Sequence, residues 1–328
     1  MYIRSQYRSL PLLLIALALA AGLAAAQEPA DRLAFKEVWA YLMTGEESYL
    51  QPAQPITDLC LFSAEINAYG ELVGIPDIRK VAAFRGRKHL VVAEIGSYSL
   101  THFCLDPTFP IRDRLLSDIL LAATPFDGVQ IDFETIPVRD RDNFIVFLGL
   151  LKAGLGKKTL SVAMPARVSE AGDAPAYAGV AAIADRIIVM AYDEHWSTSE
   201  AGPVASMDWS SRVATYAQSK IGASKLVMGL PFYGRAWGDI KVARAYKYVG
   251  IQSLITDKQI GVLFREQEVP WFQYQELVTV KVYYDDAASL VHRMGLYRAA
   301  NVGAVAFWRL GQEDPAVWSQ LSIIKPSP

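Results

Sequence analysis

Several features are scarce or absent in this chain, and each absence excludes a class of protein. There are only two cysteines and four scattered histidines in 328 residues, and no Cys/His cluster has metal-ligand spacing. No basic block is present and the formal net charge is −2, which argues against nucleic acid as a partner. No Gly-rich phosphate fingerprint follows any strand-like run. We therefore expect neither a metal nor another cofactor.

Long apolar runs are missing except at the N-terminus. Residues 1–26 carry Arg4 and Arg8, then an apolar stretch from Leu10, then a small-x-small site that ends at Ala26. This pattern predicts a cleavable signal peptide and a secreted or periplasmic protein, with cleavage at about Ala26; an uncleaved membrane anchor is the alternative. Beyond residue 26 no apolar run is long enough to cross a membrane, so we expect no span in the mature chain.

The two cysteines leave one redox question open. Export permits a disulfide between Cys60 and Cys104. However, Cys60 lies in the apolar run ITDLCLF, where a buried free thiol is the simpler interpretation.

Apolar, β-branched runs alternate with amphipathic stretches from about residue 36 onward. Strands are predicted at 37–43, 56–63, 89–96, 127–134, 159–166, 186–193, 225–234 and 302–311, and helices at 112–123, 140–155, 174–184, 208–220 and 285–300. Near-continuous apolar strands separated by helices are typical of a parallel sheet that is covered on both faces. Eight such units predict an α/β fold, a (β/α)8 TIM barrel over residues 27–328.

One connection between predicted strands is longer than a loop should be. Between the seventh and eighth strands, residues 235–284 contain strand-like segments such as VPWFQYQ and VTVKVYY. Long structureless loops are uncommon in compact domains. We therefore expect a small α+β insertion, rich in strands, on the rim of the barrel.

Polar and aromatic residues gather where the predicted strands end. The fourth strand, DGVQIDFE, alternates with period two, so Gln130, Asp132 and Glu134 would share one face. The sixth ends in MAYDEHW and the seventh in PFYGRAW. Because active sites of parallel barrels lie at the carboxyl ends of the strands, these residues would meet in one cleft. Aromatic faces with carboxylates suit a sugar-binding site, although each aromatic residue alone is more often core.

These strand ends also resemble a known family. DGVQIDFE is similar to the D-G-x-D-x-D-x-E signature of glycoside hydrolase family 18, the chitinase-like barrels. SVAMPA, MAYDEHW, MGLPFYGRAW, VYYDDAASL and AFWRLGQEDP resemble that family's other strand-end motifs, in the same order. Within the family, YDEHWSTSEAGPVAS is most similar to the bacterial branch with spore cortex-lytic N-acetylglucosaminidases.

The resemblance implies substrate-assisted retaining catalysis, in which the acetamido carbonyl of the substrate is the nucleophile. Glu134 would be the general acid/base and Asp132 would orient the acetamido group, assisted by Tyr192. The other implied site residues are Asp193, Met190, Tyr233, Trp196, Trp308 as the floor under the reacting sugar, and Asp127 as a structural hydrogen-bond acceptor. The departure is Gln130, which stands where the chitinases carry an acid and which cannot take up a proton in the same way.

The sequence thus favours an exported glycosidase that acts on β-linked N-acetylglucosaminyl bonds, in peptidoglycan or in chito-oligosaccharides, expected to be a monomer. The alternative is a non-catalytic carbohydrate-binding protein on the same barrel. A metal-dependent barrel hydrolase would need histidine ligands at strand ends, where only His195 lies. The substrate polymer, and endo or exo action, stay open.

Overall fold

A closed barrel of eight parallel strands forms the centre of the chain. The computed structural model describes residues 32–170, 175–238, 241–275 and 278–325, and the predicted signal peptide lies outside them. The barrel runs in the order β2 (Glu37–Met43), β3 (Asp58–Ile66), β5 (Arg87–Glu94), β6 (Gly128–Phe133), β7 (Thr159–Pro165), β8 (Arg186–Met190), β9 (Leu226–Pro231) and β15 (Ala304–Trp308). Pairing of β15 with β2 closes the ring, so the (β/α)8 prediction is confirmed.

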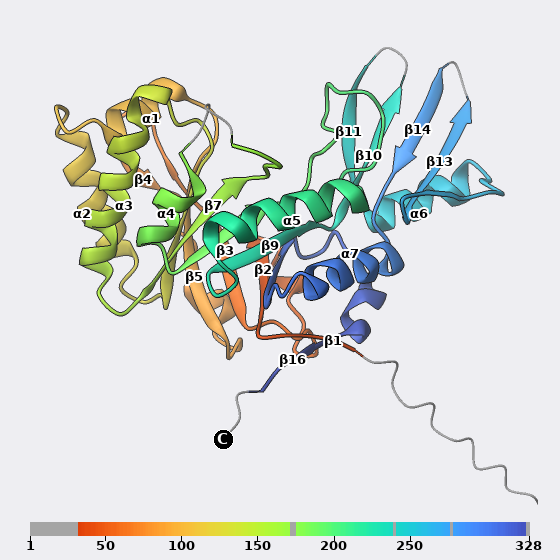
Figure 1. Cartoon of the computed structure of the whole chain (residues 1–328), viewed down its shortest axis with the longest axis horizontal. Helices are drawn as coiled ribbons and strands as arrows, with labels where there is room; N and C mark the ends of the chain where they lie inside the picture. The colour runs from red at the N-terminus through yellow and green to blue at the C-terminus, as the bar shows by residue number, and fades with distance from the viewer. Residues whose placement is uncertain (1–31, 171–174, 239–240, 276–277, 326–328) are drawn as a thin grey trace, which may run out of the picture. The chain divides into compact units, whose positions relative to one another are not determined.

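Helices cover the outside of the barrel (Figure 1). They are α1 (Tyr98–Leu105), α2 (Ile111–Ala122), α3 (Arg141–Leu155), α4 (Tyr177–Ile183), α5 (Met207–Ile221) and α7 (Ala287–Ala299). The five predicted helices are confirmed, and α1 was missed. The apolar stripe of α3 shows why these segments are helical, because residues three and four apart share a face: Phe144, Phe147, Leu148 and Leu151 are all buried.

The strand alternation sorts side chains into two apolar clusters. On β6, Val129, Ile131 and Phe133 point outward into the cluster between strands and helices. A second cluster fills the barrel interior with Trp39, Tyr41, Cys60, Val91, Ile188, Val227, Ala304 and Ala306. Both cysteines are buried and free, so the simpler interpretation of their chemistry is confirmed.

Ion pairs close the amino-terminal end of the barrel. The fully buried Asp58 accepts two hydrogen bonds from Arg87, at 2.7 and 2.8 Å, and lies 2.8 Å from Nε2 of His89. Glu37 accepts two from Arg186, at 2.7 and 2.9 Å. Burial alone would raise the pKa of Asp58, but the hydrogen bonds from His89 and Arg87 outweigh it and hold that pKa below its usual value. Because this end of a barrel serves stability, the chemistry lies at the other end.

An α+β insertion separates β9 from β15, as predicted. Its antiparallel sheet has the order β11-β10-β14-β13-β12, formed by β10 (Tyr233–Gly238), β11 (Lys241–Lys247), β12 (Phe264–Glu266), β13 (Val269–Gln275) and β14 (Thr279–Tyr283). Helix α6 (Tyr248–Asp257) packs through Ile251 on one face, against Phe272, Val282 and Tyr284. Figure 1 shows these strands and α6 grouped beyond α5 and α7.

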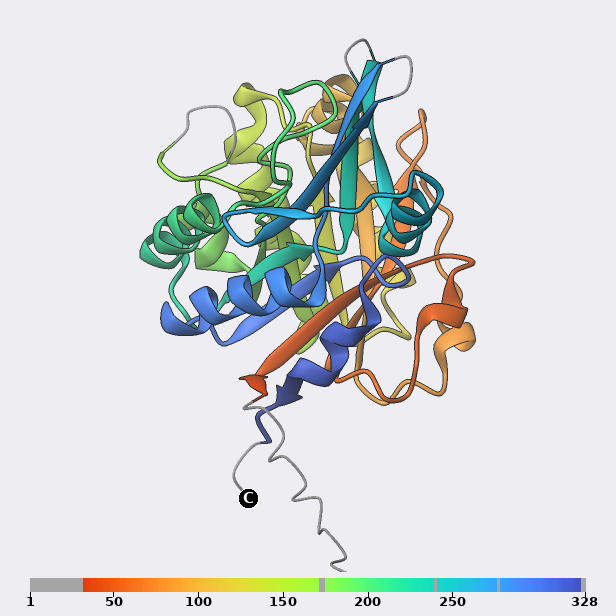
Figure 2. The ribbon, with the colours of Figure 1, turned by 90° about the vertical axis from the view of Figure 1, so that its right-hand side faces the viewer.

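Short elements complete the fold. They are β1 (Leu33–Phe35), β4 (Leu72–Val73), β16 (Leu321–Ile323) and the 3-10 turns η1 (Glu47–Tyr49), η2 (Ile78–Val81), η3 (Val138–Asp140) and η4 (Pro315–Gln320). Strands β1 and β16 pair in parallel, which brings the two ends of the described chain side by side (Figure 2). Within the described residues, no helix combines the length and the apolar character that a membrane span needs.

Candidate active site

A cleft of about 450 Å³ opens at the carboxyl ends of the barrel strands. Seven residues singled out in the sequence line it: Asp132, Glu134, Met190, Tyr192, Asp193, Tyr233 and Trp308. Tyr41, Met43, Phe62, Ile95, Arg235, Ala245, Arg309 and Gln312 also line it and were not assigned from the sequence. The cleft therefore combines carboxylates, aromatic rings and two arginines.

The carboxylates of β6 sit at different depths in the cleft. Asp132 is 4% exposed, whereas Glu134 follows the last residue of β6 and reaches the open side. The Oδ1 atom of Asp132 has no hydrogen-bond partner among the described residues. Burial, and then repulsion from Glu134, raise the pKa of Asp132 to about 7. Burial, and then the charge of Asp193, raise the pKa of Glu134. Both carboxyl groups thus retain protons more strongly than exposed acids do.

Gln130 lies on the same inward face, below Asp132. It is fully buried, and its Nε2 donates to Oγ of Ser161 at 3.3 Å on the neighbouring strand β7. Its Oε1 has no partner within the described part of the chain. A neutral amide fits this dry position because an ionised acid would cost far more to bury.

A tyrosine–aspartate–arginine group forms the wall that follows β8 and begins β10. The Oδ1 atom of Asp193 accepts hydrogen bonds from the hydroxyl of Tyr233 at 2.6 Å and from Nη2 of Arg235 at 2.8 Å. Asp193 has a left-handed backbone, with φ of 60°, which turns the chain away from β8. Burial raises the pKa of Tyr192, whose ring meets that of Tyr233 edge-on. This tyrosine is therefore a protonated hydrogen-bond donor at neutral pH.

Gly229 of β9 makes the room that Tyr192 occupies. A Cβ atom at Gly229 would lie 2.8 Å from the carbonyl oxygen of Val189 and 3.1 Å from Cε1 of Tyr192. A larger residue at this position would have to displace the tyrosine or the strand.

An aromatic floor lies at the end of β15. The ring of Trp308 meets Phe62 and Tyr41 edge-on, with centroids 4.8 and 5.2 Å apart. Because strands β15 and β6 are four positions apart either way around the ring of eight, Trp308 and Glu134 come from opposite sides of the mouth.

Three residues noted in the sequence lie elsewhere. Trp196 is 52% exposed, is not among the cleft residues, and donates its indole N–H to Oγ1 of Thr198. Asp127 lies at the opposite end of β6, where it accepts a hydrogen bond from the backbone N–H of Lys88 at 2.8 Å. Nδ1 of His195 lies 2.8 Å from the carbonyl of Pro203, which is a structural contact.

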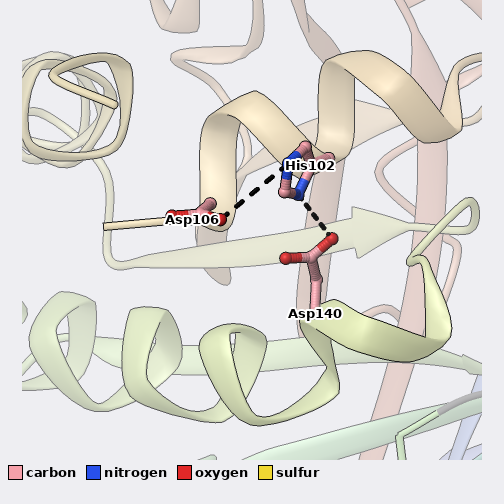
Figure 3. Close-up of side chains that lie close together, drawn as sticks. All are labelled: His102, Asp106 and Asp140. Atoms are coloured by element: carbon pink, nitrogen blue, oxygen red, sulfur yellow. Dashed lines mark hydrogen bonds and ion pairs between the residues drawn. The ribbon is translucent and has the colours of Figure 1, made fainter. Parts of the chain in front are cut away.

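One side-chain cluster outside the cleft has the composition of a metal site. His102 of α1 lies between two carboxylates, with Nδ1 2.9 Å from Asp140 and Nε2 3.8 Å from Asp106 (Figure 3). The linear spacing did not reveal it because Asp140 comes from a different segment. Asp140 also accepts a hydrogen bond from Nδ2 of Asn143 and lies 3.7 Å from Nε of Arg139. The guanidinium group of Arg139 would therefore compete with a metal ion for this carboxylate. The contact between His102 and Asp140 therefore links α1 to η3.

Comparisons with known proteins agree with this architecture. The sequence model described as glycosyl hydrolases family 18 matches residues 117–313, and the chain belongs to that family. YdhD of Bacillus subtilis, named as a candidate sporulation-specific glycosylase, is 29% identical over 220 residues, which are 61% of this chain and 51% of YdhD. The chain thus spans about half the length of that relative.

Two solved structures share the fold. The spore cortex-lytic enzyme SleL of Bacillus cereus superposes with a TM-score of 0.80 at 23% identity, over 90% of this chain and 76% of SleL. A chitinase from Chromobacterium violaceum gives a TM-score of 0.79 at 23% identity, over 87% of this chain and 97% of the chitinase.

Proposed function

We propose that this chain is an exported glycosidase that cleaves β-linked N-acetylglucosaminyl bonds by substrate-assisted retaining catalysis. The observation that carries the proposal is the pair of inward carboxylates, Asp132 and Glu134, at the mouth of a family 18 barrel, both with raised pKa values. Burial and neighbouring carboxylates make both groups retain a proton more strongly than an exposed acid does, which an acid catalyst needs at neutral pH.

Glu134 is the group that moves the proton. It reaches the open side of the cleft, where it donates a proton to the glycosidic oxygen as the bond to the anomeric carbon breaks. The acetamido carbonyl oxygen of the substrate attacks the same carbon and forms a cyclic oxazolinium ion. Glu134, now ionised, then takes a proton from the water that opens this ring.

Asp132 is a positioning and charge-stabilising group. Its carboxylate accepts the acetamido N–H, which aims the carbonyl at the anomeric carbon and balances the positive charge of the oxazolinium ion. The unpartnered Oδ1 of Asp132 is consistent with this role, because a buried acceptor without a partner is costly unless a ligand supplies the donor.

The surrounding side chains hold the sugar. Trp308 supplies a flat apolar face under the ring, and the Tyr192 hydroxyl is a donor toward the acetamido group. Tyr233 and Arg235 fix Asp193, which keeps that wall of the cleft in place. Gln130 lies below Asp132 and adds no charge, so β6 brings two carboxyl groups to the cleft, Asp132 and Glu134.

Peptidoglycan or its fragments are the favoured substrate. The support comes from the names of two similar proteins, a candidate sporulation-specific glycosylase and a spore cortex-lytic enzyme, and from the signal-peptide pattern of residues 1–26. Chito-oligosaccharides contain the same bond type and are the second substrate class to test.

Mass spectrometry of the products from a panel of peptidoglycan fragments and chito-oligosaccharides tests the proposal. Glu134→Gln keeps the shape of the side chain but removes the acidic proton that the reaction needs. This variant is therefore the inactive control. We expect wild-type protein to release products that end in N-acetylglucosamine and the variant to release none. Tight binding of these glycans without any turnover by the wild type would instead indicate the non-catalytic carbohydrate-binding function.

A further inference from the structure

Two cations share one carboxylate, and one of the cations, Arg309, lines the cleft, whereas Lys247 and Glu46 are not among the cleft residues. Nη1 of Arg309 contacts Oε2 of Glu46, and Nζ of Lys247 lies 3.1 Å from Oε1 of the same residue. These groups come from three distant segments: the end of β15, the turn after β2 and the end of β11. One negative charge facing two positive charges leaves this cluster with a net charge of +1.

The cluster is partly buried and held in place. The side chains of Arg309, Glu46 and Lys247 are 18%, 23% and 32% exposed. The ammonium group of Lys247 also lies 4.7 Å from the centre of the Tyr49 ring, which packs against Gly311. Water and salt screen a partly buried charge less than a charge on the open surface.

Donors remain on both cations after they bind Glu46. A guanidinium group has five N–H donors and an ammonium group has three. Arg309 lines the cleft next to Trp308, on the side of the mouth opposite Glu134. Arg309 is therefore a cation beside the aromatic floor of the cleft, and it would attract a negative group on a substrate that lies against Trp308.

We propose that Arg309, held by Glu46 and with Lys247 on the same carboxylate, forms a carboxylate-binding subsite for a glycan that carries a free acid on a sugar, such as the lactyl ether acid of an N-acetylmuramyl residue. This inference rests on the proposed function and narrows its substrate class. In intact peptidoglycan the lactyl acid is bound as an amide to a peptide. The chain would therefore follow an amide hydrolase, whose water adds across that bond and releases the free carboxylate.

A matched pair of substrates tests the inference. The two glycans share one N-acetylglucosaminyl–N-acetylmuramyl backbone and differ only in the lactyl group, a free acid in one and a methyl amide in the other. We expect the wild type to prefer the free acid in kcat/KM by about tenfold, which one charge-assisted hydrogen bond supplies. Added salt should reduce this preference.

Three variants separate recognition from a structural role. Arg309→Gln should bring the preference to about one. Glu46→Gln should raise it, because both cations then lose their internal partner. Arg112→Gln is the control: Arg112 is 16% exposed, pairs with Asp113 at 2.9 Å and lies on α2 outside the cleft, so the preference should not change.

Two outcomes would overturn the subsite: a wild-type preference of one, or a shift in the same direction for Arg309→Gln and Glu46→Gln. Calorimetric binding of both glycans is measured in parallel. If the wild type cleaves neither glycan, the proposed function fails, yet a binding preference for the acid that Arg309→Gln removes would still support the subsite.

Discussion

Asp132→Asn should stabilise the folded chain, and more so at neutral than at acidic pH. The pKa of Asp132 is about 7 when folded, against an ordinary value of 3.8, so the folded state holds its proton more tightly than the unfolded chain. For such a group the stability is highest below the unfolded pKa and is lost as pH rises towards the folded pKa. From these two values, linkage gives a loss in the free energy of unfolding of about 4 kcal/mol at pH 7 and about 1.7 kcal/mol at pH 5.

The assay is urea unfolding of wild type and Asp132→Asn at pH 5 and pH 7. Asparagine matches the neutral acid in size, so the difference in the free energy of unfolding should grow by about 2 kcal/mol between these pH values. Because burial is the larger cause of the shift and Glu134 the smaller, the same comparison in a Glu134→Gln background should keep most of this growth. A difference that is independent of pH would refute the raised pKa of Asp132.

Two further predictions concern strand β6. Gln130→Asp adds a third carboxyl group below the pair, so the alkaline limb of kcat/KM should move to higher pH, with Gln130→Asn as the uncharged control; an unmoved profile would contradict the account of this residue. Gly128→Ala places a Cβ 2.5 Å from Nδ1 of His89 and 2.6 Å from the Thr159 carbonyl, which should lower the free energy of unfolding by about 1–3 kcal/mol. Gly295→Ala, in open space on α7, should instead raise it by about 1 kcal/mol, and equal effects in urea unfolding would count against the packing explanation.

Much of the fold could be predicted because the barrel repeats one local pattern. Period two on DGVQIDFE correctly placed Asp132 inward and Ile131 outward, and the strand-end rule brought Tyr192 and Trp308 to the same cleft. The sixth strand is shorter than predicted and ends at Met190, because the backbone N–H groups of Ala191 and Tyr192 bond to carbonyls two residues earlier and Asp193 is left-handed.

Residues that depend on tertiary contacts could not be predicted. Trp196 follows that turn and is carried to an exposed position, although its motif suggested the cleft. Helix α6 was missed because its sequence, YVGIQSLITD, is rich in β-branched residues within a strand-like region. Glu46 meets Lys247 from 201 positions away, and no local pattern predicts such a pair.

The central claim is that the acetamido group of the substrate is the nucleophile and that Asp132 orients it and stabilises the charge that forms. The most direct measurement is kcat for a series of substrates whose N-acetyl group carries zero, one, two or three fluorine atoms. Fluorine withdraws electrons from the carbonyl oxygen, so kcat should fall steeply along the series. A kcat that stays constant would show that the carbonyl does not attack, and it would contradict the role given to Asp132.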